Sequence, residues 1–231
     1  MKLLTDSERA EISHAIKEAE KQTSCEIVVV EISRCDDYNS AGFAWGIIFA
    51  LLSCILWLIA KASILPAPQD WVWSAGAHAS APMTVIAYPL LEWILVQALG
   101  FLAGFFLIGK IASLKRLLIP RAKMQNEANY RVESEFYRHG LYKTKEENGI
   151  LIMLSVFERA VVVMADKGAN SKVASDYWEA MKNRIVSGIK QNQAGRAIVE
   201  VISSAAGELK KHFPAKSEDK NELPDNVITK K

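Results

Sequence analysis

Residues 43–60 read FAWGIIFALLSCILWLIA, and residues 83–109 read MTVIAYPLLEWILVQALGFLAGFFLIG. The first stretch has no charged residue, and the second has one, Glu92. A helix rises about 1.5 Å per residue and a bilayer core is about 30 Å thick, so about 20 apolar residues suffice to cross it. The sequence therefore predicts two membrane-spanning helices. The alternative, two buried helices of a soluble protein, requires a larger surrounding domain than the rest of the chain provides.

Basic residues indicate the orientation of these spans, because they concentrate on the cytoplasmic side. They cluster directly after the second stretch, whereas the connection 61–82 has a single lysine. We expect this connection to be an external loop. The protein would then be a multi-pass protein of the inner (plasma) membrane, with both termini and the soluble part in the cytoplasm. The juxtamembrane segment 110–120 and the residues after it can also contact anionic headgroups. The five basic residues expected at the membrane are Lys110, Lys115, Arg116, Arg121 and Lys123.

The N-terminal residues before the first span do not have the apolar region of a secretory signal. The first span is therefore expected to serve as the insertion signal. The three cysteines, Cys25, Cys35 and Cys54, show no CxxC spacing, and Cys54 lies within the first span. Unpaired thiols are typical of a reducing compartment, which agrees with a cytoplasmic domain.

The segments outside the spans alternate between helix and strand patterns. Thr5 and Glu8 have the spacing of a capping box, which predicts a helix from there to about Lys21. Residues 26–33, EIVVVEIS, predict a strand buried on both faces, as in a parallel sheet. After the spans, the pattern predicts in order a helix at 121–139, strands at 149–155 and 160–165, a helix from Asn170 or Ser171 to about Ile189, and a helix at 193–212. The polar residues 215–231 are expected to form a disordered tail.

This order predicts an α/β fold in which the spans interrupt one domain, formed by residues 1–42 and 121–214. The first strand ends near the membrane because the first span follows closely. The helix at 121–139 leaves the membrane, so the strand at 149–155 starts far from it and runs back. The two strands are therefore expected to be parallel, and the strand at 160–165 should form a hairpin with the second.

The soluble segments resemble the TPM-domain family. The resemblance rests on Leu4-Thr5-Asp6 and the helix after it, on Thr23–Val30 and Tyr38, on Asn148–Ile152, on Glu158–Val163, and on Leu209 with His212-Phe213-Pro214. It implies an α/β/α sandwich with a small mixed sheet. It also implies a phosphatase, a calcium-binding module, or a membrane-bound protein that assembles or modulates other proteins.

The sequence departs from the usual family pattern in two respects. Its membrane segment lies inside the domain, whereas typical members carry an anchor at the C-terminus and expose the domain outside the cytoplasm. The glycine-rich turn after the third strand is reduced to residues 165–168.

A loop at Asp166 is the candidate ligand site. Asp166 ends a predicted strand, Asp176 lies in the following helix, and Glu26 begins the parallel strand at the same end of the sheet. Carboxylates that converge there would suit a divalent cation such as calcium, which prefers oxygen ligands. The alternative is a solvated loop in which Asp166 pairs with Lys167 or Lys172.

Two features of the spans have competing interpretations. Glu92 is an intramembrane carboxylate, which is a functional candidate by default, but the spans supply no second acid or base for a proton relay. It can also reach the interface, pair with His78 or Lys61, or stay protonated. Gly100 and Gly104 form a GxxxG face that predicts close helix packing, either within the pair of spans or with another membrane protein or a second copy.

The chain has no GxSxG, P-loop or HExxH motif, and its basic residues are not interleaved with aromatics as in nucleic-acid-binding proteins. We therefore expect partners in the lipid bilayer and among membrane proteins, and no nucleic acid. The favoured interpretation is a membrane-anchored module that binds or modulates partner membrane proteins without evident catalysis. The alternative is a metal-dependent phosphatase at the Asp166 end of the sheet.

Overall fold

A computed structural model describes residues 3–64, 83–108, 110–215, 223 and 226–230. The chain divides into two compact units. Unit 1 comprises Met1–Asp36 and Arg121–Lys231, and unit 2 is the insertion Asp37–Pro120. Unit 1 is thus discontinuous in sequence, because unit 2 is inserted between its two segments.

Unit 1 contains a four-stranded mixed sheet in the order β3-β2-β1-β4. Strand β1 (Ile27–Ile32) pairs in parallel with β2 (Ile150–Ser155), and β2 pairs in antiparallel with β3 (Ala160–Ala165). The parallel pairing and the hairpin were both predicted and are confirmed. The Val- and Ile-rich strands suit a pleated surface that is covered on both sides, and every residue of β1 and β2 is buried.

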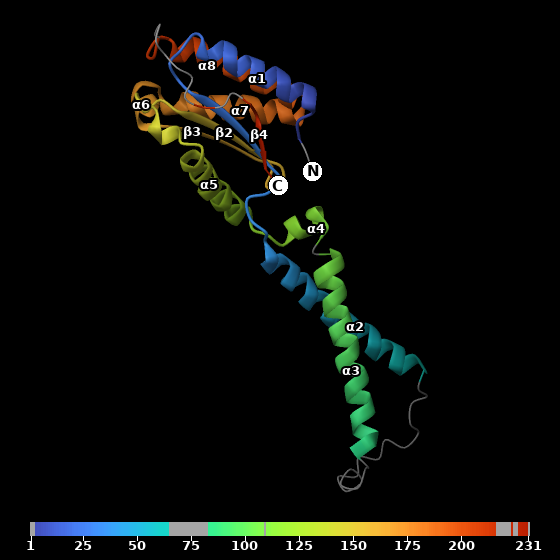
Figure 1. Cartoon of the computed structure of the whole chain (residues 1–231). Helices are drawn as coiled ribbons and strands as arrows, with labels where there is room; N and C mark the ends of the chain where they lie inside the picture. Colours follow the sequence, from blue (N-terminus) through green and yellow to red (C-terminus); the bar gives the residue numbers. More distant parts are fainter. Residues whose placement is uncertain (1–2, 65–82, 109, 216–222, 224–225, 231) are drawn as a thin grey trace. The chain divides into compact units, whose positions relative to one another are not determined.

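One face of the sheet is covered by α1 (Asp6–Glu20), α7 (Ser175–Lys190) and α8 (Ala194–Leu209) (Figure 1). Their apolar side chains pack with alternate strand residues such as Ile27, Val29 and Ile152. The predicted capping box begins α1, because Thr5 Oγ1 accepts a hydrogen bond from Glu8 N and Glu8 Oε2 accepts one from Thr5 N at 2.8 Å. Glu8 Oε1 also accepts a hydrogen bond from Gly195 N, which links the start of α1 to the start of α8.

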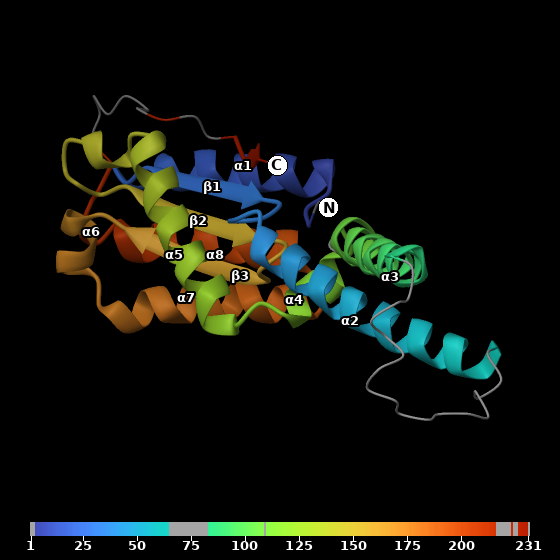
Figure 2. The same ribbon diagram turned by 90° about the horizontal axis from the view of Figure 1, so that it is seen from below.

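The other face is covered by α5 (Arg121–Arg138), which lies on the opposite side of the sheet in both views (Figures 1 and 2). Its buried stripe includes Ala128, Val132 and Phe136, which pack with the other alternate strand residues, such as Val28 and Met153. Unit 1 is therefore an α/β/α sandwich with a small mixed sheet, in agreement with the prediction.

Two predictions for unit 1 were wrong. The prediction of a disordered tail is contradicted at β4 (Ile228–Lys230), which pairs in parallel with Val30, Glu31 and Ile32 of β1, whereas residues 216–222, 224–225 and 231 lie outside the described residues. The helix expected from Asn170 or Ser171 is instead divided into α6 (Lys167–Lys172) and α7, because Val173 and Ala174 have extended backbone conformations. After α5, the chain forms the 3-10 turn η2 (Leu141–Lys143).

Unit 2 contains α2 (Asn39–Ile64), α3 (Met83–Ala103), the π-helical turn η1 (Gly104–Ile108) and α4 (Ala112–Leu117) (Figure 2). Within the described residues, one helix segment, Asn39–Ala60, is long and apolar enough to cross a membrane. The second apolar segment with described side chains, Leu90–Phe106, is shorter, so the two-span hairpin stays a prediction. The predicted external loop falls mainly on residues 65–82, which lie outside the described residues.

Candidate functional site

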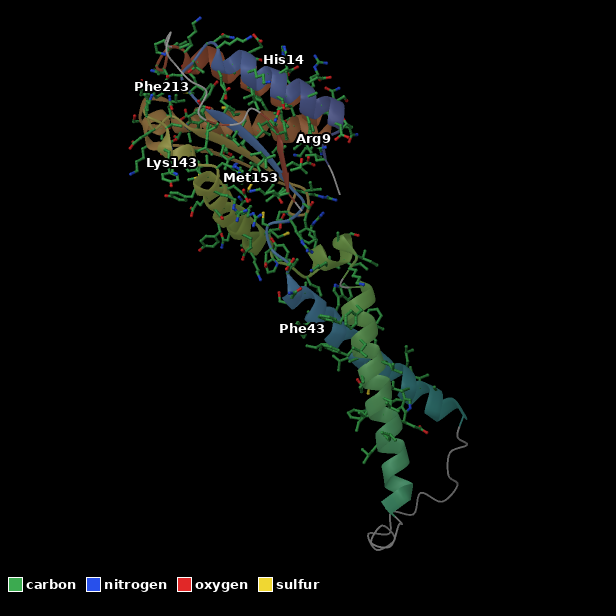
Figure 3. All side chains as sticks on the ribbon, in the orientation of Figure 1. Arg9, His14, Phe43, Lys143, Met153 and Phe213 are labelled. Atoms are coloured by element: carbon green, nitrogen blue, oxygen red, sulfur yellow. The ribbon has the colours of Figure 1, made fainter. Side chains whose placement is uncertain are left out.

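The surface of α2 is apolar around most of its circumference. Its exposed side chains are large and aliphatic or aromatic, and their exposed fractions lie between 48% and 66%. Phe43, near the start of the helix, is labelled in Figure 3. Water disfavours such a surface by about 25 cal/mol per Å², whereas lipid chains do not. The exposed large residues on α2 are Phe43, Ile47, Leu51, Leu52, Ile55, Leu56, Leu58 and Ile59.

The described part of α3 and η1 has the same character. No lysine, arginine, aspartate or histidine occurs between residues 90 and 106, and the one acid there is Glu92. Glu92 lies on the exposed surface of α3, immediately before the exposed Trp93. The exposed large residues are Leu90, Leu91, Trp93, Ile94, Leu95, Leu99, Leu102 and Phe106.

The predicted packing glycines lie where α3 and η1 meet α2. A Cβ atom on Gly100 would lie 3.0 Å from the carbonyl oxygen of Phe49, and one on Gly104 would lie 2.8 Å from the Cβ of Phe49. A Cβ on Gly46 would lie 2.7 Å from the ring of Phe101. Glycine is thus needed on both helices for this close approach, as in small-residue helix contacts in membranes.

Polar and aromatic contacts add to this packing. The hydroxyl of Ser53 donates to the carbonyl oxygen of Ala50 at 2.8 Å or to that of Val96 on α3 at 3.3 Å. The ring centroids of Phe43 and Phe105 lie 5.0 Å apart. Because the hydroxyl is satisfied by backbone acceptors, Ser53 fits an apolar environment without an unpaired polar group.

The five predicted membrane-contacting basic residues are divided between the two units. Lys110 is exposed, and Lys115 and Arg116 lie half-buried on α4 in unit 2, where Lys115 Nζ donates to the carbonyl oxygen of Asp37. Arg121 and Lys123 belong to α5 in unit 1.

The predicted cation ligands are not brought together. In the described part of the chain, no group of three or more His, Cys, Asp or Glu residues could hold a metal ion. Asp166 caps α6, and its Oδ1 accepts a hydrogen bond from Lys167 N at 2.8 Å. Asp176 is exposed in the first turn of α7. Glu26 lies at the same end of the sheet as Asp166, because the two residues flank Ile27 and Ala165, which both pair with Ile150 of β2.

The opposite end of the sheet holds a polar cluster that was not predicted from the sequence. Glu158 in the β2–β3 turn accepts hydrogen bonds from the hydroxyl of Ser155 and, at 2.9 Å, from the backbone N–H of Cys35. The thiol of Cys35 can donate to Ser155 Oγ at 3.5 Å, and burial raises the pKa of this thiol to about 12. The thiol is therefore protonated at neutral pH and is not a nucleophile. The cluster closes the turn against the end of β1.

A second cluster surrounds Glu135, whose side chain on α5 is fully buried. Its Oε1 lies 3.1 Å from Arg131 Nε and 3.2 Å from Arg138 Nη1, and its Oε2 lies 3.2 Å from His139 Nε2. Lys230 of β4 also forms an ion pair with this carboxylate. Burial opposes ionisation, but the surrounding cations outweigh it and lower the pKa of Glu135. Burial and the charge of Lys230 lower the pKa of His139.

Glu31, the residue before the last of β1, is another buried carboxylate and is 1% exposed. It accepts hydrogen bonds from Arg9 Nη2 at 2.7 Å and from the backbone N–H groups of Leu3 and Leu4. The hydrogen bond with Glu31 raises the pKa of Arg9 despite partial burial. These contacts tie the N-terminal residues and α1 to the sheet.

The chain is similar to known proteins in sequence pattern and in fold. The sequence pattern of the TPM domain matches residues 1–50 and 115–208. The NMR structure of the BA42 protein from the psychrophilic bacterium Bizionia argentinensis is similar, with a TM-score of 0.54 and 21% identity over 98% of this chain and 94% of that one. At this identity the likeness concerns the fold. No curated protein matches the chain.

Proposed function

The chain belongs to the TPM-domain family, and from this premise we propose that it is a membrane-anchored TPM module that binds or modulates partner membrane proteins. In this proposal the module acts by binding, and unit 1 faces the cytoplasm. The partner is another membrane protein or a second copy of the chain.

The observation that carries the proposal is the exposed apolar surface of α2. Its segment Asn39–Ala60 has the length of a membrane span, and almost none of it is buried within the protein. A core helix of a soluble protein would bury its apolar side chains. The matching surface of α3 supports a second span, and the glycine contacts between the helices support a packed pair.

The topology can be tested with reporters that fluoresce or are cleaved on one side of the inner membrane only. One reporter is inserted at Asp70 and another is fused after Lys231. The proposal expects an external signal at Asp70 and a cytoplasmic signal at the C-terminus. The reverse pattern, or release of the protein by alkaline carbonate, would contradict it.

Partner binding needs a separate experiment. The full chain is cross-linked in intact membranes, solubilised in several mild detergents and recovered through an affinity tag. The proposal expects a specific membrane protein, or a cross-linked dimer, in each detergent. Recovery of the monomer alone in all of them would refute the binding function while leaving the anchor intact.

A metal-dependent phosphatase at the Asp166 end of the sheet is the second candidate. It is favoured by one observation: Asp166 Oδ2 is buried and has no hydrogen-bond partner among the described residues. The candidate requires hydrolysis of a phosphate ester that depends on a divalent cation such as calcium. Assays of the full chain and of the Asp166→Asn variant decide it, since activity that persists in the variant would exclude this site.

A further inference from the structure

A groove on unit 1 runs between α1 and the residues that lead into β4. We name it the α1 groove. Its volume is about 450 Å³. Figure 3 shows that its labelled members Arg9 and His14 both come from α1. The lining residues are Arg9, Ala10, Ser13, His14, Lys17, Asn226 and Val227.

The spacing of the polar residues explains why they share the groove. Arg9, Ser13 and Lys17 recur every four residues, and His14 lies one position after Ser13, so all four lie along one side of the helix. His14 and Lys17 are exposed, whereas the apolar residues on the other side of α1 pack against the sheet and α8.

The donors in the groove have the chemistry of an anion site. The described lining residues supply a guanidinium, an ammonium, an imidazole, a hydroxyl and an amide, and none of these described residues has a carboxylate. Arg9 is held in place because Nη2 donates to Glu31 and Nη1 donates to Asp6 at 2.6 Å. Its Nε is buried and has no hydrogen-bond partner among the described residues. Because Arg9 is already paired with these two carboxylates, it shapes the groove, and the contacts to an anion fall to the other polar lining residues.

The second wall of the groove belongs to the C-terminal segment. The backbone N–H of Val227 donates to Ser13 Oγ at 3.4 Å, so this hydroxyl can still donate its own proton. Val227 leads directly into β4, where Lys230 pairs with the buried Glu135. The groove therefore requires that β4 is docked on β1.

We propose that the α1 groove binds a phosphate-type oxyanion, and that the bound anion holds the C-terminal strand on the sheet. The anion contacts Lys17 and His14 on the helix and Asn226 on the C-terminal wall. Because the site exists only when β4 is docked, binding favours the docked state by mass action. This site does not depend on the proposed membrane-protein binding, since all its residues lie in unit 1.

The test uses the full chain in a non-ionic detergent at low ionic strength, titrated calorimetrically with pyrophosphate. We expect saturable binding that Lys17→Gln weakens about tenfold, the effect of one charge-assisted contact. His14→Ala should weaken it less. The control is Lys182→Gln on α7, which removes an equal charge from an exposed pair with Glu179 and should leave the affinity unchanged.

A third variant tests the link with the C-terminal strand. Lys230→Gln lies outside the groove but removes the ion pair that holds β4, so it should also weaken pyrophosphate binding. Unchanged affinity in this variant would overturn the coupling. Equal affinities of the Lys17→Gln and Lys182→Gln variants, or no saturable binding, would overturn the site.

The phosphate can come from a soluble compound or from a lipid headgroup. The same variants are therefore compared on nanodiscs with and without phosphatidic acid, and hydrogen exchange of Ile228–Lys230 is measured. Protection by pyrophosphate identifies a soluble ligand. Protection only by phosphatidic acid, lost in Lys17→Gln, identifies a headgroup. No protection by either would refute the proposal.

Discussion

Lys230 on β4 forms an ion pair with Glu135 on α5. The contact joins the edge strand of the sheet to the helix that covers one face, across 95 positions of sequence. Glu135 is fully buried, so the charge of Lys230 acts where water screens little.

Removal of this charge should loosen β4. We expect Lys230→Gln to lower the free energy of unfolding of unit 1 by about 1–3 kcal/mol, because Glu135 keeps Arg131 and Arg138 as partners. Hydrogen exchange at Ile228–Lys230 should accelerate more than exchange in β2. If exchange rises equally throughout the sheet, the pair does not act on β4.

The Arg9 carboxylate partners allow a matched comparison of a buried and an exposed ion pair. Glu31→Gln removes the buried carboxylate that accepts a charge-assisted hydrogen bond from Arg9, and should cost about 1.5–3 kcal/mol of unfolding free energy. Asp6→Asn removes the exposed partner of the same Arg9, with 88% of the Asp6 side chain exposed, and should cost less than about 1 kcal/mol. Chemical denaturation followed by circular dichroism measures both, and similar costs would contradict the prediction.

The packing of α2 on η1 can be tested at Gly104. A Cβ there would overlap the carbonyl oxygen of Trp45 and lie 2.8 Å from Phe49 Cβ, so Gly104→Ala should force the helices apart and cost about 1–3 kcal/mol. Gly207→Ala on α8 is the control: a Cβ there meets nothing within 4 Å, and helix propensity should stabilise it by up to about 1 kcal/mol. Thermal unfolding in detergent measures both. A Gly104→Ala protein that melts at the wild-type temperature would show that the close approach is not needed.

Unit 1 should lose stability in two steps as the pH falls. The pKa of His139 is below its ordinary value of 6.5, so the unfolded chain binds the proton first and stability decreases below about pH 6.5. The pKa of Glu135 is below 4.5, so a second decrease begins near that value and continues through the folded-state pKa. Urea denaturation between pH 3 and 8 measures the curve.

The variant His139→Gln separates these two steps. It should abolish the decrease that begins near pH 6.5 and retain the decrease at lower pH, because Glu135 keeps its cationic partners. An unchanged upper step would show that another group causes it.

Local patterns predicted much of the fold. The capping box at Thr5 and Glu8 and the continuous Val and Ile residues of β1 specified elements that the structure confirms. The length of the helix after Arg121 specified the direction of β2 relative to β1. These signals suffice because each is formed by neighbours in the sequence.

The missed features depend on distant partners. β4 is three residues long in a polar segment, and its order comes from pairing with β1 and from the contact with Glu135. The break between α6 and α7 at Val173 and Ala174 has no glycine or proline to indicate it. This break leaves Asp176 in the exposed first turn of a new helix, which explains why the predicted carboxylates do not converge.

The central position of β1 has a consequence for synthesis. Its partners are β2, which follows only after the whole of unit 2, and β4, at the last described residues of the chain. At about 5–20 residues per second, the ribosome needs on the order of 6–25 s to advance from β1 to β2. During this interval the uncharged residues Val28–Val30 are exposed to other nascent chains, because the backbone hydrogen-bonding groups on both sides of β1 are not yet paired. In the proposed membrane-anchored state, insertion of unit 2 into the bilayer takes place within this interval, so a slow insertion step should lead to aggregation of β1 before any loss of the anchor.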